Sequence, residues 1–195
     1  MNIFNLNDDP KICAQEHCDK HAVKMNVEYP QLLSTAHRVL DGHEYIGKTA
    51  NGRNIKRWRL DEYDDEIYLA CHVNHPSAIW CRESQANYIW LYQLWAELSA
   101  EYTHRYGKVH TCWQKLGGIL AFPPKNIPVG TGMQDRTQPP PAMKLYPQCI
   151  VPGDSIQSYK NYYIEAKAHF AKWTNRKTPE WFSNARIQLQ SSEGG

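Results

Sequence analysis

The sequence predicts a mainly α-helical fold in which residues 1–195 form a single compact domain. Three observations point to this class: apolar residues recur at helical spacing over long stretches, only one short segment alternates as a strand pair would, and prolines gather between helical stretches. With 42% hydrophobic residues and a formal charge of only +2, the chain can bury enough apolar surface to fold, which excludes wholesale disorder.

The first helical stretch begins after Asp9-Pro10, because aspartate is a good helix cap and proline suits the first helical position. Its apolar residues continue at mostly helical spacing to Asp41-Gly42. Pro30 falls inside this run and should kink or break the helix, since proline lacks an amide proton and crowds the preceding turn. We therefore expect one bent helix or two abutting ones.

Residues 43–69 are expected to form a small hairpin or an extended loop. Asn51-Gly52 lies between two alternating stretches, where this pair favours a tight turn with positive φ. Charge is segregated along the segment, because a basic half with Arg53, Lys56 and Arg57 precedes an acidic run that starts at Asp61. The basic half could face phosphate, and a solvated surface is an equally good interpretation.

A second helix is predicted from about Pro76 or Ser77 to Tyr106, because its apolar residues cover a broad face. Residues 122–153 hold eight of the twelve prolines and are predicted to form a long loop without regular structure, a feature that is usually functional or mobile. A third amphipathic helix is predicted from about Asp154 to Thr174, and a short last helix near Pro179.

Several function classes are excluded by missing patterns. The sequence has no phosphate-binding glycine loop, no GxSxG elbow and no dinucleotide fingerprint. No stretch approaches the roughly 18 apolar residues of a membrane helix, and the first residues lack the layout of a secretion signal. The six dispersed cysteines are interpreted as reduced thiols. We expect a cytoplasmic monomer that needs no cofactor.

Histidine and cysteine are concentrated in two places, which raises the question of a metal site. The two groups are Cys13, His17, Cys18 and His21 in the first helix, and Cys71, His72, His75 and Cys81 around the start of the second. They could supply tetrahedral ligands, but neither CxxC nor HExxH occurs. Packed or hydrogen-bonded histidines are the better interpretation, and no metal is predicted.

A polar stripe runs along the otherwise apolar first helix. It consists of His21, Lys24, Glu28, Gln31 and Thr35, spaced three or four residues apart. A carboxylate one turn from a lysine can act as a general acid or base, or can form an ion pair on the helix surface. Taken alone, the spacing favours the ion pair.

Several short motifs, in order along most of the chain, resemble the phage pyrimidine-dimer DNA glycosylase and AP lyase family of the endonuclease V type. They are the start Met1-Asn2-Ile3-Phe4-Asn5-Leu6, the D-x-H-x6-E-x-P helix signature (Asp19, His21, Glu28, Pro30), Ala50-Asn51-Gly52-Arg53, Ala70-Cys71-His72-Val73, the end of the second helix (Glu101, Arg105, Gly107), and Arg176, Pro179 and Trp181. The resemblance implies a compact helical domain with the N-terminus threaded close to the first helix.

The resemblance also implies a mechanism. The family uses the N-terminal α-amine as the nucleophile at the sugar C1′, and a glutamate of the first helix supports base loss and strand cleavage. In this sequence the amine would be that of Met1, or of Asn2 after processing, and the carboxylate would be Glu28. His21 would orient one of them, and Lys24 is the alternative imine-forming amine. Duplex DNA with a damaged or modified pyrimidine is the implied partner, in the host cytoplasm if the gene belongs to a phage.

The family's DNA-contacting arginines fall at Ile3, Val27 and Gln31 in this sequence, so other residues must contact DNA. A stretch rich in basic and aromatic residues lies near the C-terminal end. Its cations and aromatic rings suit phosphate contact and base stacking. An amphipathic helix that buries its aromatic rings is an equally good interpretation. The predicted DNA-binding residues are Lys20, Arg53, Lys56, Arg57, Lys172, Trp173, Arg176, Lys177 and Trp181.

The sequence thus predicts a DNA glycosylase with associated AP lyase activity and leaves three alternatives open. One is an enzyme of the same fold that acts on a hypermodified base or a nucleotide. Another is a non-catalytic module that binds nucleic acid or a nucleotide, and the last is a structural protein that holds a metal ion.

Overall fold

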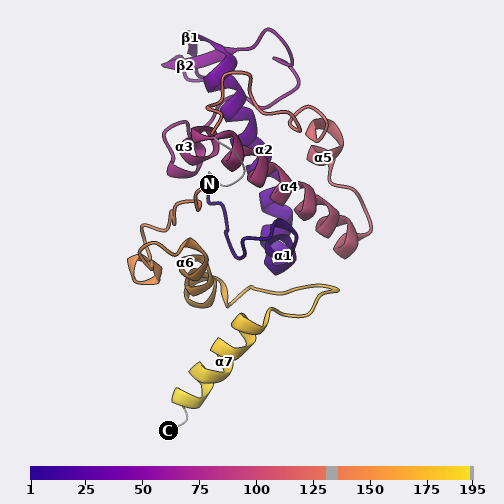
Figure 1. Cartoon of the computed structure of the whole chain (residues 1–195), viewed down its shortest axis with the longest axis vertical. Coiled ribbons are helices and arrows are strands. Elements are labelled where there is room, and N and C mark those ends of the chain that lie inside the picture. Colours follow the sequence, from indigo (N-terminus) through magenta and orange to yellow (C-terminus); the bar gives the residue numbers. More distant parts are fainter. Residues whose placement is uncertain (131–135, 194–195) are drawn as a thin grey trace.

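The computed structural model of the chain describes residues 1–130 and 136–193. Within these residues it contains seven α-helices and one two-stranded sheet, so the prediction of a mainly α fold is confirmed (Figure 1). The elements are α1 (Pro10–Glu16), α2 (Asp19–Asp41), β1 (His43–Lys48), β2 (Asn54–Arg59), α3 (Pro76–Glu83), α4 (Gln85–Tyr106), α5 (Thr111–Leu116), the 3-10 turn η2 (Pro147–Cys149), α6 (Ser155–Tyr162), the π-helical turn η3 (Tyr163–Lys167) and α7 (Glu180–Glu193).

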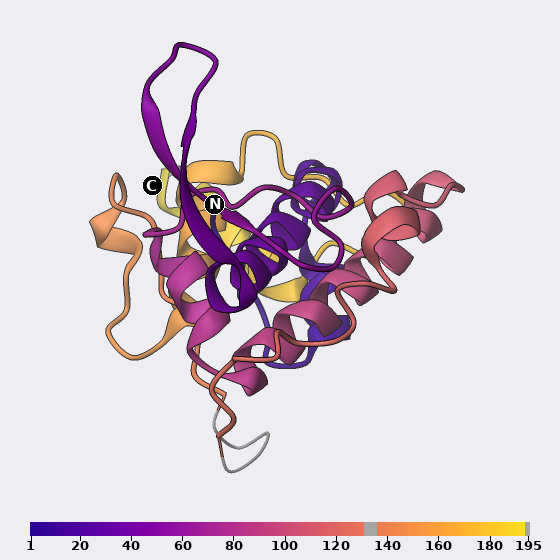
Figure 2. The same cartoon turned by 90° about the horizontal axis from the view of Figure 1, so that it is seen from above.

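The core forms where α2 and α4 pack together, with α1 against α4 and α3 against both (Figure 2). Leu32 and Leu33 of α2 and Leu91, Leu94 and Trp95 of α4 are fully buried in a single hydrophobic cluster. The same cluster takes in the first residues of the chain and the rings of α6 and η3. No helix of the described residues is long and apolar enough to cross a membrane.

The first helical stretch is two abutting helices, as one of the two expectations has it, but they meet at His17-Cys18 and no break falls at Pro30. α2 runs through Pro30, which is buried. At the end of α1 the carbonyls bond to distant side chains instead: Arg105 donates to Gln15 O at 3.0 Å, and Trp173 donates to Glu16 O at 2.9 Å. Because tertiary partners satisfy these carbonyls, the helix can end here.

The predicted second helix is also divided, which corrects the expectation of one helix. Ser84 has extended backbone angles, and its hydroxyl accepts a hydrogen bond from the amide of Asn87 at 3.2 Å, so it caps a new helix, α4. The far end is as predicted: Gly107 adopts a left-handed φ of 68° and closes α4.

The third helix is shorter than predicted. α6 begins at Ser155, with Asp154 as its cap, and passes at Tyr163 into the π-helical turn η3. The last helix does begin near Pro179, but α7 is 14 residues long, and the sequence did not predict α5. In the proline-rich segment, η2 supplies one regular turn where none was expected, and residues 131–135 lie outside the described part of the chain.

A two-stranded antiparallel ribbon confirms the predicted hairpin. β1 pairs with β2 so that His43 lies opposite Arg59 and Lys48 lies opposite Asn54. The turn closes through a bond from the amide of Thr49 to Arg53 O at 2.9 Å, and Gly52 takes a φ of 75°. Figure 2 shows the ribbon projecting from the helical body.

The ribbon is held at its base by Arg38, a buried arginine of α2. Its guanidinium donates to Trp58 O at 2.8 Å, to the Asp64 carboxylate at 2.7 Å and to Ile67 O at 3.1 Å. One charged side chain thereby joins the end of α2, the second strand and the loop after it. The ribbon therefore leaves the body in a fixed direction, although an isolated hairpin is only marginally stable.

Candidate active site

The first residues of the chain are threaded through the core, in line with the expectation from the resemblance. Ile3, Asn5 and Leu6 are fully buried. The amide of Phe4 donates to the Tyr29 hydroxyl at 3.2 Å, and the Cys13 thiol donates to Phe4 O at 3.2 Å. These contacts fix the backbone so that Met1 and Asn2 emerge at one defined place on the surface.

A polarised chain of hydrogen bonds supports this segment from α1 and α2. Nδ1 of His17 lies 2.7 Å from Cys13 O and must donate, because a carbonyl only accepts. Burial lowers the pKa of His17 to about 4, so the ring is neutral and Nε2 accepts from the Tyr29 hydroxyl at 2.8 Å. Because the Tyr29 hydroxyl donates its proton to His17, it acts as the acceptor in its bond with the Phe4 amide. The residue after Glu28 therefore positions the start of the chain.

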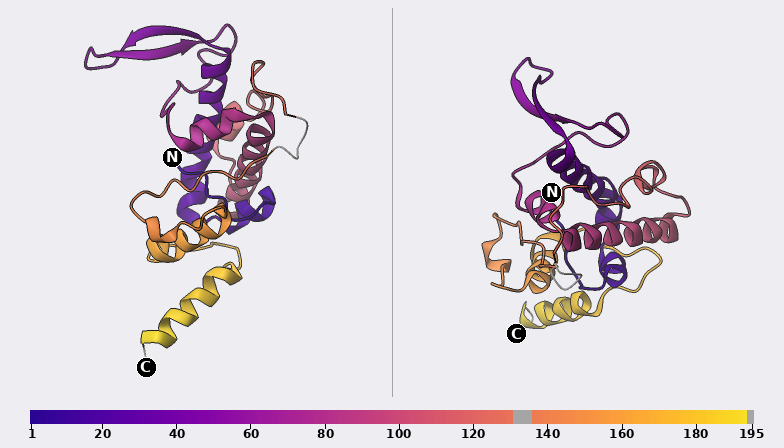
Figure 3. Two further views of the ribbon diagram at one scale, coloured as in Figure 1. Left: turned by 60° about the vertical axis from the view of Figure 1, so that its left-hand side comes forward. Right: turned by 45° about the horizontal axis from the view of Figure 1, so that its top comes forward.

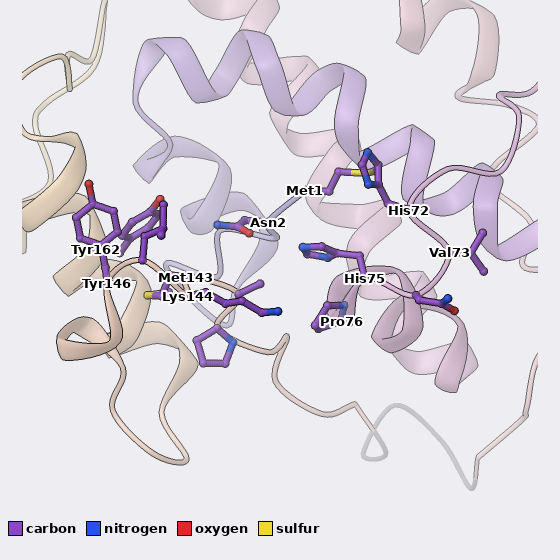
Figure 4. Close-up of a pocket in the computed structure, with 14 residues that line it drawn as sticks. Met1, Asn2, His72, Val73, His75, Pro76, Met143, Lys144, Tyr146 and Tyr162 are labelled. Carbon is purple, nitrogen blue, oxygen red and sulfur yellow. The ribbon is translucent and has the colours of Figure 1, made fainter. Parts of the chain in front are cut away.

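Met1 and Asn2 open into a cavity of about 810 Å³, shown in Figure 4. Its walls come from residues 72–76 at the start of α3, from residues 141–146 of the proline-rich segment, and from Tyr162 of α6. A cavity of this size holds a drug-sized or nucleotide-sized molecule. It brings together three segments that are far apart in the sequence.

Glu28 and the Met1 amine lie close enough to act on the same two side chains. Burial lowers the pKa of His75, the positive charge of the Met1 amine lowers it further, and the Glu28 carboxylate opposes both. Burial raises the pKa of the Cys71 thiol, which the same carboxylate and amine also affect, again in opposite directions. The predicted nucleophile and the predicted carboxylate are therefore neighbours of one group, His75.

The predicted alternative amine is held beside the carboxylate. Lys24 Nζ lies 3.1 Å from Glu28 Oε1 across one helical turn. The side chain of Glu28 is 18% exposed, whereas that of Lys24 is 64% exposed. The ion pair favoured by the spacing is therefore present, and it leaves the lysine amine largely open to solvent.

His75 has a defined tautomer that suits it to donate a hydrogen bond into the cavity. It caps α3, and its Nδ1 accepts from the amide of Ser77 at 3.2 Å. With the pKa lowered, the ring is neutral at pH 7 and its proton lies on Nε2. In Figure 4 the ring points toward Asn2.

His72 reaches the cavity on a strained backbone. Its φ is 48°, in the left-handed region that non-glycine residues rarely adopt. A turn bond from the His75 amide to His72 O at 2.8 Å stabilises this conformation, and Thr35 Oγ1 accepts from the Cys71 amide at 3.2 Å. Thr35, the last residue of the polar stripe, thus ties this loop to α2. Strained backbone residues of this kind cluster at active sites and ligand-binding sites, which agrees with the place of His72 in the cavity wall.

His21, which was predicted to orient the amine or the carboxylate, lies in the aromatic core instead of the cavity lining. Its ring stacks on Phe4 with the centroids 4.0 Å apart, and Nδ1 lies 2.5 Å from the Tyr163 hydroxyl. Burial lowers its pKa well below the usual value. It supports the N-terminal segment from behind.

The predicted DNA-binding residues separate into two groups. Arg53, Lys56 and Arg57 lie together on the ribbon and its turn. Most residues of the C-terminal stretch have structural partners. Trp173 is buried, so it cannot stack on a base, and the Arg176 guanidinium bonds to both oxygens of Glu101 at 2.8–3.0 Å.

The remaining predicted contacts are exposed to different degrees. Lys172 is exposed, and Lys177 forms an exposed ion pair with Glu180 at 2.8 Å. Trp181 is half-buried against Tyr163, and Lys20 places its amine 4.4 Å from the centre of the Phe170 ring. Ile3, at a position where the resembling family has an arginine, is fully buried and cannot contact DNA.

Several cavity residues were not predicted to be in the site: His72, His75, Lys144, Tyr146 and Tyr162. The sequence did point to both segments. His72 belongs to the Ala70-Cys71-His72-Val73 motif, and Lys144 and Tyr146 belong to the long proline-rich loop, a feature that is usually functional or mobile. The histidines and cysteines considered for a metal do not assemble, because no three His, Cys, Asp or Glu side chains of the described residues are placed to hold an ion.

Comparison of the chain with known protein families, with curated proteins and with solved structures finds no match.

Proposed function

We propose that this protein is a DNA glycosylase with associated AP lyase activity that acts on damaged or modified pyrimidines. The proposal is carried by the place of Met1 and His75 in the wall of one cavity, together with the electrostatic action of the Glu28 carboxylate and the Met1 amine on His75. Met1 lines the nucleotide-sized cavity, and Glu28 is not among its lining residues. An amine and a carboxylate are the groups that imine chemistry at a sugar requires.

The proposed reaction uses each group at a stated atom. The Met1 amine attacks C1′, and the bond between C1′ and the base breaks as the base takes up a proton. The sugar ring then opens to an imine, loss of a proton from C2′ expels the 3′ phosphate, and water releases the enzyme. Glu28 stabilises the positive charge at the sugar and accepts the C2′ proton, while Nε2–H of the neutral His75 donates to the departing base.

Borohydride trapping tests this proposal. The protein with Met1 as its first residue is incubated at low salt with duplexes that contain an abasic site or a pyrimidine dimer, and any imine is reduced. We expect a covalent adduct that maps to Met1. A two-residue extension ahead of Met1 should abolish the adduct on both duplexes. Glu28→Gln should abolish it on the dimer duplex, which needs base loss first, and retain it on the abasic duplex, whereas Lys24→Ala should retain it on both. No adduct with the unaltered protein would reject the proposal, and an adduct on Lys24 would reassign the nucleophile.

A second candidate is an enzyme that uses the same groups on a hypermodified base or on a nucleotide. The cavity wall favours it, because residues 141–146 and Tyr162 add a lysine and two tyrosines that could surround a substituent larger than a methyl group. Mass spectrometry of nucleosides from DNA incubated with the protein separates this candidate from dimer repair, since it consumes a hypermodified base and leaves dimers intact.

A protein that binds DNA without any chemistry would give a result different from both enzymes in the trapping and binding experiments. Glu28→Gln would then leave DNA affinity unchanged or improve it, and no adduct or released base would form. This outcome identifies a non-catalytic binding module.

A further inference from the structure

The ribbon formed by β1 and β2 carries most of the chain's surplus positive charge. Residues 43–59 contain five lysines and arginines (Lys48, Arg53, Lys56, Arg57 and Arg59) and one acidic residue, Glu44. Its local charge of +4 exceeds the net +2 of the whole chain, so the remainder is slightly negative. A projecting element of this kind is suited to a polyanion.

The strand register divides the ribbon into two unlike faces, because residues directly opposite each other point to the same side. One face carries His43, Tyr45, Gly47, Ile55, Arg57 and Arg59, and is called the arginine face below. The other carries Glu44, Ile46, Lys48, Asn54, Lys56 and Trp58. On this second face Lys56 is paired with Glu44 at 2.9 Å, and Lys48 bonds to Asn54 at 2.5 Å.

The arginines lack such partners. Among the side chains that the structure describes, those of residues 1–130 and 136–188, no carboxylate lies within ion-pair distance of Arg57 or Arg59. The guanidinium of Arg59 lies 5.4 Å from the centre of the exposed Tyr45 ring, and Arg57 is the residue directly opposite Tyr45 in the strand register. Gly47 allows this packing: a Cβ there would lie 3.0 Å from Arg57 Cγ and 3.4 Å from the Tyr45 ring. The arginine face therefore presents two arginines without a direct ion-pair partner. Acidic residues approach it at His43, which lies 3.4 Å from Asp61, and at Arg59, which interacts electrostatically with Asp64.

The dimensions and direction of the ribbon fit duplex DNA. Six residues per strand span about 20 Å, and the major groove, about 12 Å wide, admits a two-stranded ribbon. The left view of Figure 3 shows the ribbon, the N-terminus and the orange segment around residue 145 on the same side of the molecule. A duplex held by the ribbon would therefore lie on the side where the cavity opens.

We propose that the β1–β2 ribbon is an arm that holds duplex DNA, with Arg57 and Arg59 of the arginine face bound to phosphates of the groove edge and Tyr45 beside them. The arm extends the proposed function by naming the surface that holds the substrate. It requires only that duplex DNA binds and makes no use of the reaction at Met1.

Salt-dependent binding to an undamaged duplex tests the arm separately from catalysis. Arg57→Ala/Arg59→Ala should weaken binding at least tenfold at low salt and make the slope of log K against log salt shallower by about 1.8, the loss of two phosphate contacts. Lys48→Ala/Lys56→Ala removes the same charge from the other face and should weaken binding less than threefold. Arg57→Lys/Arg59→Lys should keep most of the affinity and the slope.

The arm is rejected if the two alanine pairs weaken binding equally, if the arginine pair has no effect, or if the unaltered protein does not bind a duplex. The altered side chains lie outside the core, so each variant should keep its helical body. Circular dichroism checks this. Failure of trapping together with ribbon-dependent binding would reject the glycosylase and keep the arm. Trapping without ribbon dependence would do the reverse.

Discussion

The amide of Phe4 and the hydroxyl of Tyr29 are 3.2 Å apart, and this bond fixes the start of the chain against the helix that carries Glu28. Tyr29 is fully buried, and burial raises its pKa well above the usual value, so the hydroxyl stays protonated and continues the chain of bonds to His17. The candidate nucleophile is thus positioned by a residue that touches neither the cavity nor a substrate.

Tyr29→Phe should lower the free energy of unfolding by about 1–3 kcal/mol, because two buried polar groups lose their partner. It should also slow trapping, since Met1 is no longer held in place. Tyr92→Phe is the matched control: its hydroxyl donates to Gly117 O at 2.9 Å between α4 and α5, away from the cavity. The control should lose some stability in urea denaturation and keep its trapping rate. Equal trapping by both variants would contradict the positioning role.

His17 should make the protein less stable in mild acid. The unfolded chain takes up a proton near pH 6.5, whereas the folded chain does so only near pH 4, so protonation favours unfolding between these values. Stability contributed by the neutral ring is complete above pH 6.5 and falls by about 3 kcal/mol on the way to pH 4. Urea denaturation at several pH values measures this slope.

His17→Gln should flatten the slope but not remove it, because burial also lowers the pKa of His21. The exposed residue His169 provides the control, and His169→Gln should retain the original slope. An unchanged slope in His17→Gln would show that this ring is not the titrating group.

Glu101 joins α4 to the segment before α7. It accepts bonds from Arg105 at 2.7 Å and from Arg176. Burial alone would raise its pKa, but the bonds from both arginines outweigh burial and lower it. Glu101→Ala leaves the buried Arg105 guanidinium with Asp19, 2.9 Å away, as its remaining carboxylate partner. We therefore expect a loss of about 1–3 kcal/mol in the free energy of unfolding, as for a buried hydrogen-bonding group that loses one partner. Glu180→Ala, which removes the exposed partner of Lys177, should leave that free energy unchanged.

His75 can be tested without losing the cap of α3. Asparagine is also a good cap but is too short to replace the Nε2–H donor, so His75→Asn should keep stability and lower the rate of base release at least tenfold. His75→Ala should lose the same activity and also about 1 kcal/mol of stability. Base release is followed by chromatography. A fully active His75→Asn would restrict this residue to capping.

Local signals in the sequence were sufficient for most of the fold. The Asp9 cap, the Asn51-Gly52 turn and the Gly107 terminator each act through neighbouring residues, and all three lie where the sequence predicts. The break at His17 could not be predicted, because the partners of the α1 carbonyls are Arg105 and Trp173, which are distant in sequence. Pro30 also misled as a sign of a break, since α2 continues through it with Pro30 buried.

The candidate site could be predicted in part. Spacing places Lys24 and Glu28 together, since residues four apart share a helix face. His75 and Tyr162 could not be placed, because the cavity arises only where the loop before α3, the proline-rich segment and α6 converge. Near the C-terminal end, composition could not reveal that Arg176 is already paired with Glu101.

Burial of the first residues also determines when the site can form during synthesis. The ring of Phe4 packs at 5.6 Å from the rings of both Tyr159 and Tyr163, more than 150 residues later. A growing chain leaves the ribosome with its N-terminal end first, so Phe4 emerges long before these partners exist. Phe4 is thus made early and put in place late, and an incomplete chain lacks the fixed segment that leads to the cavity.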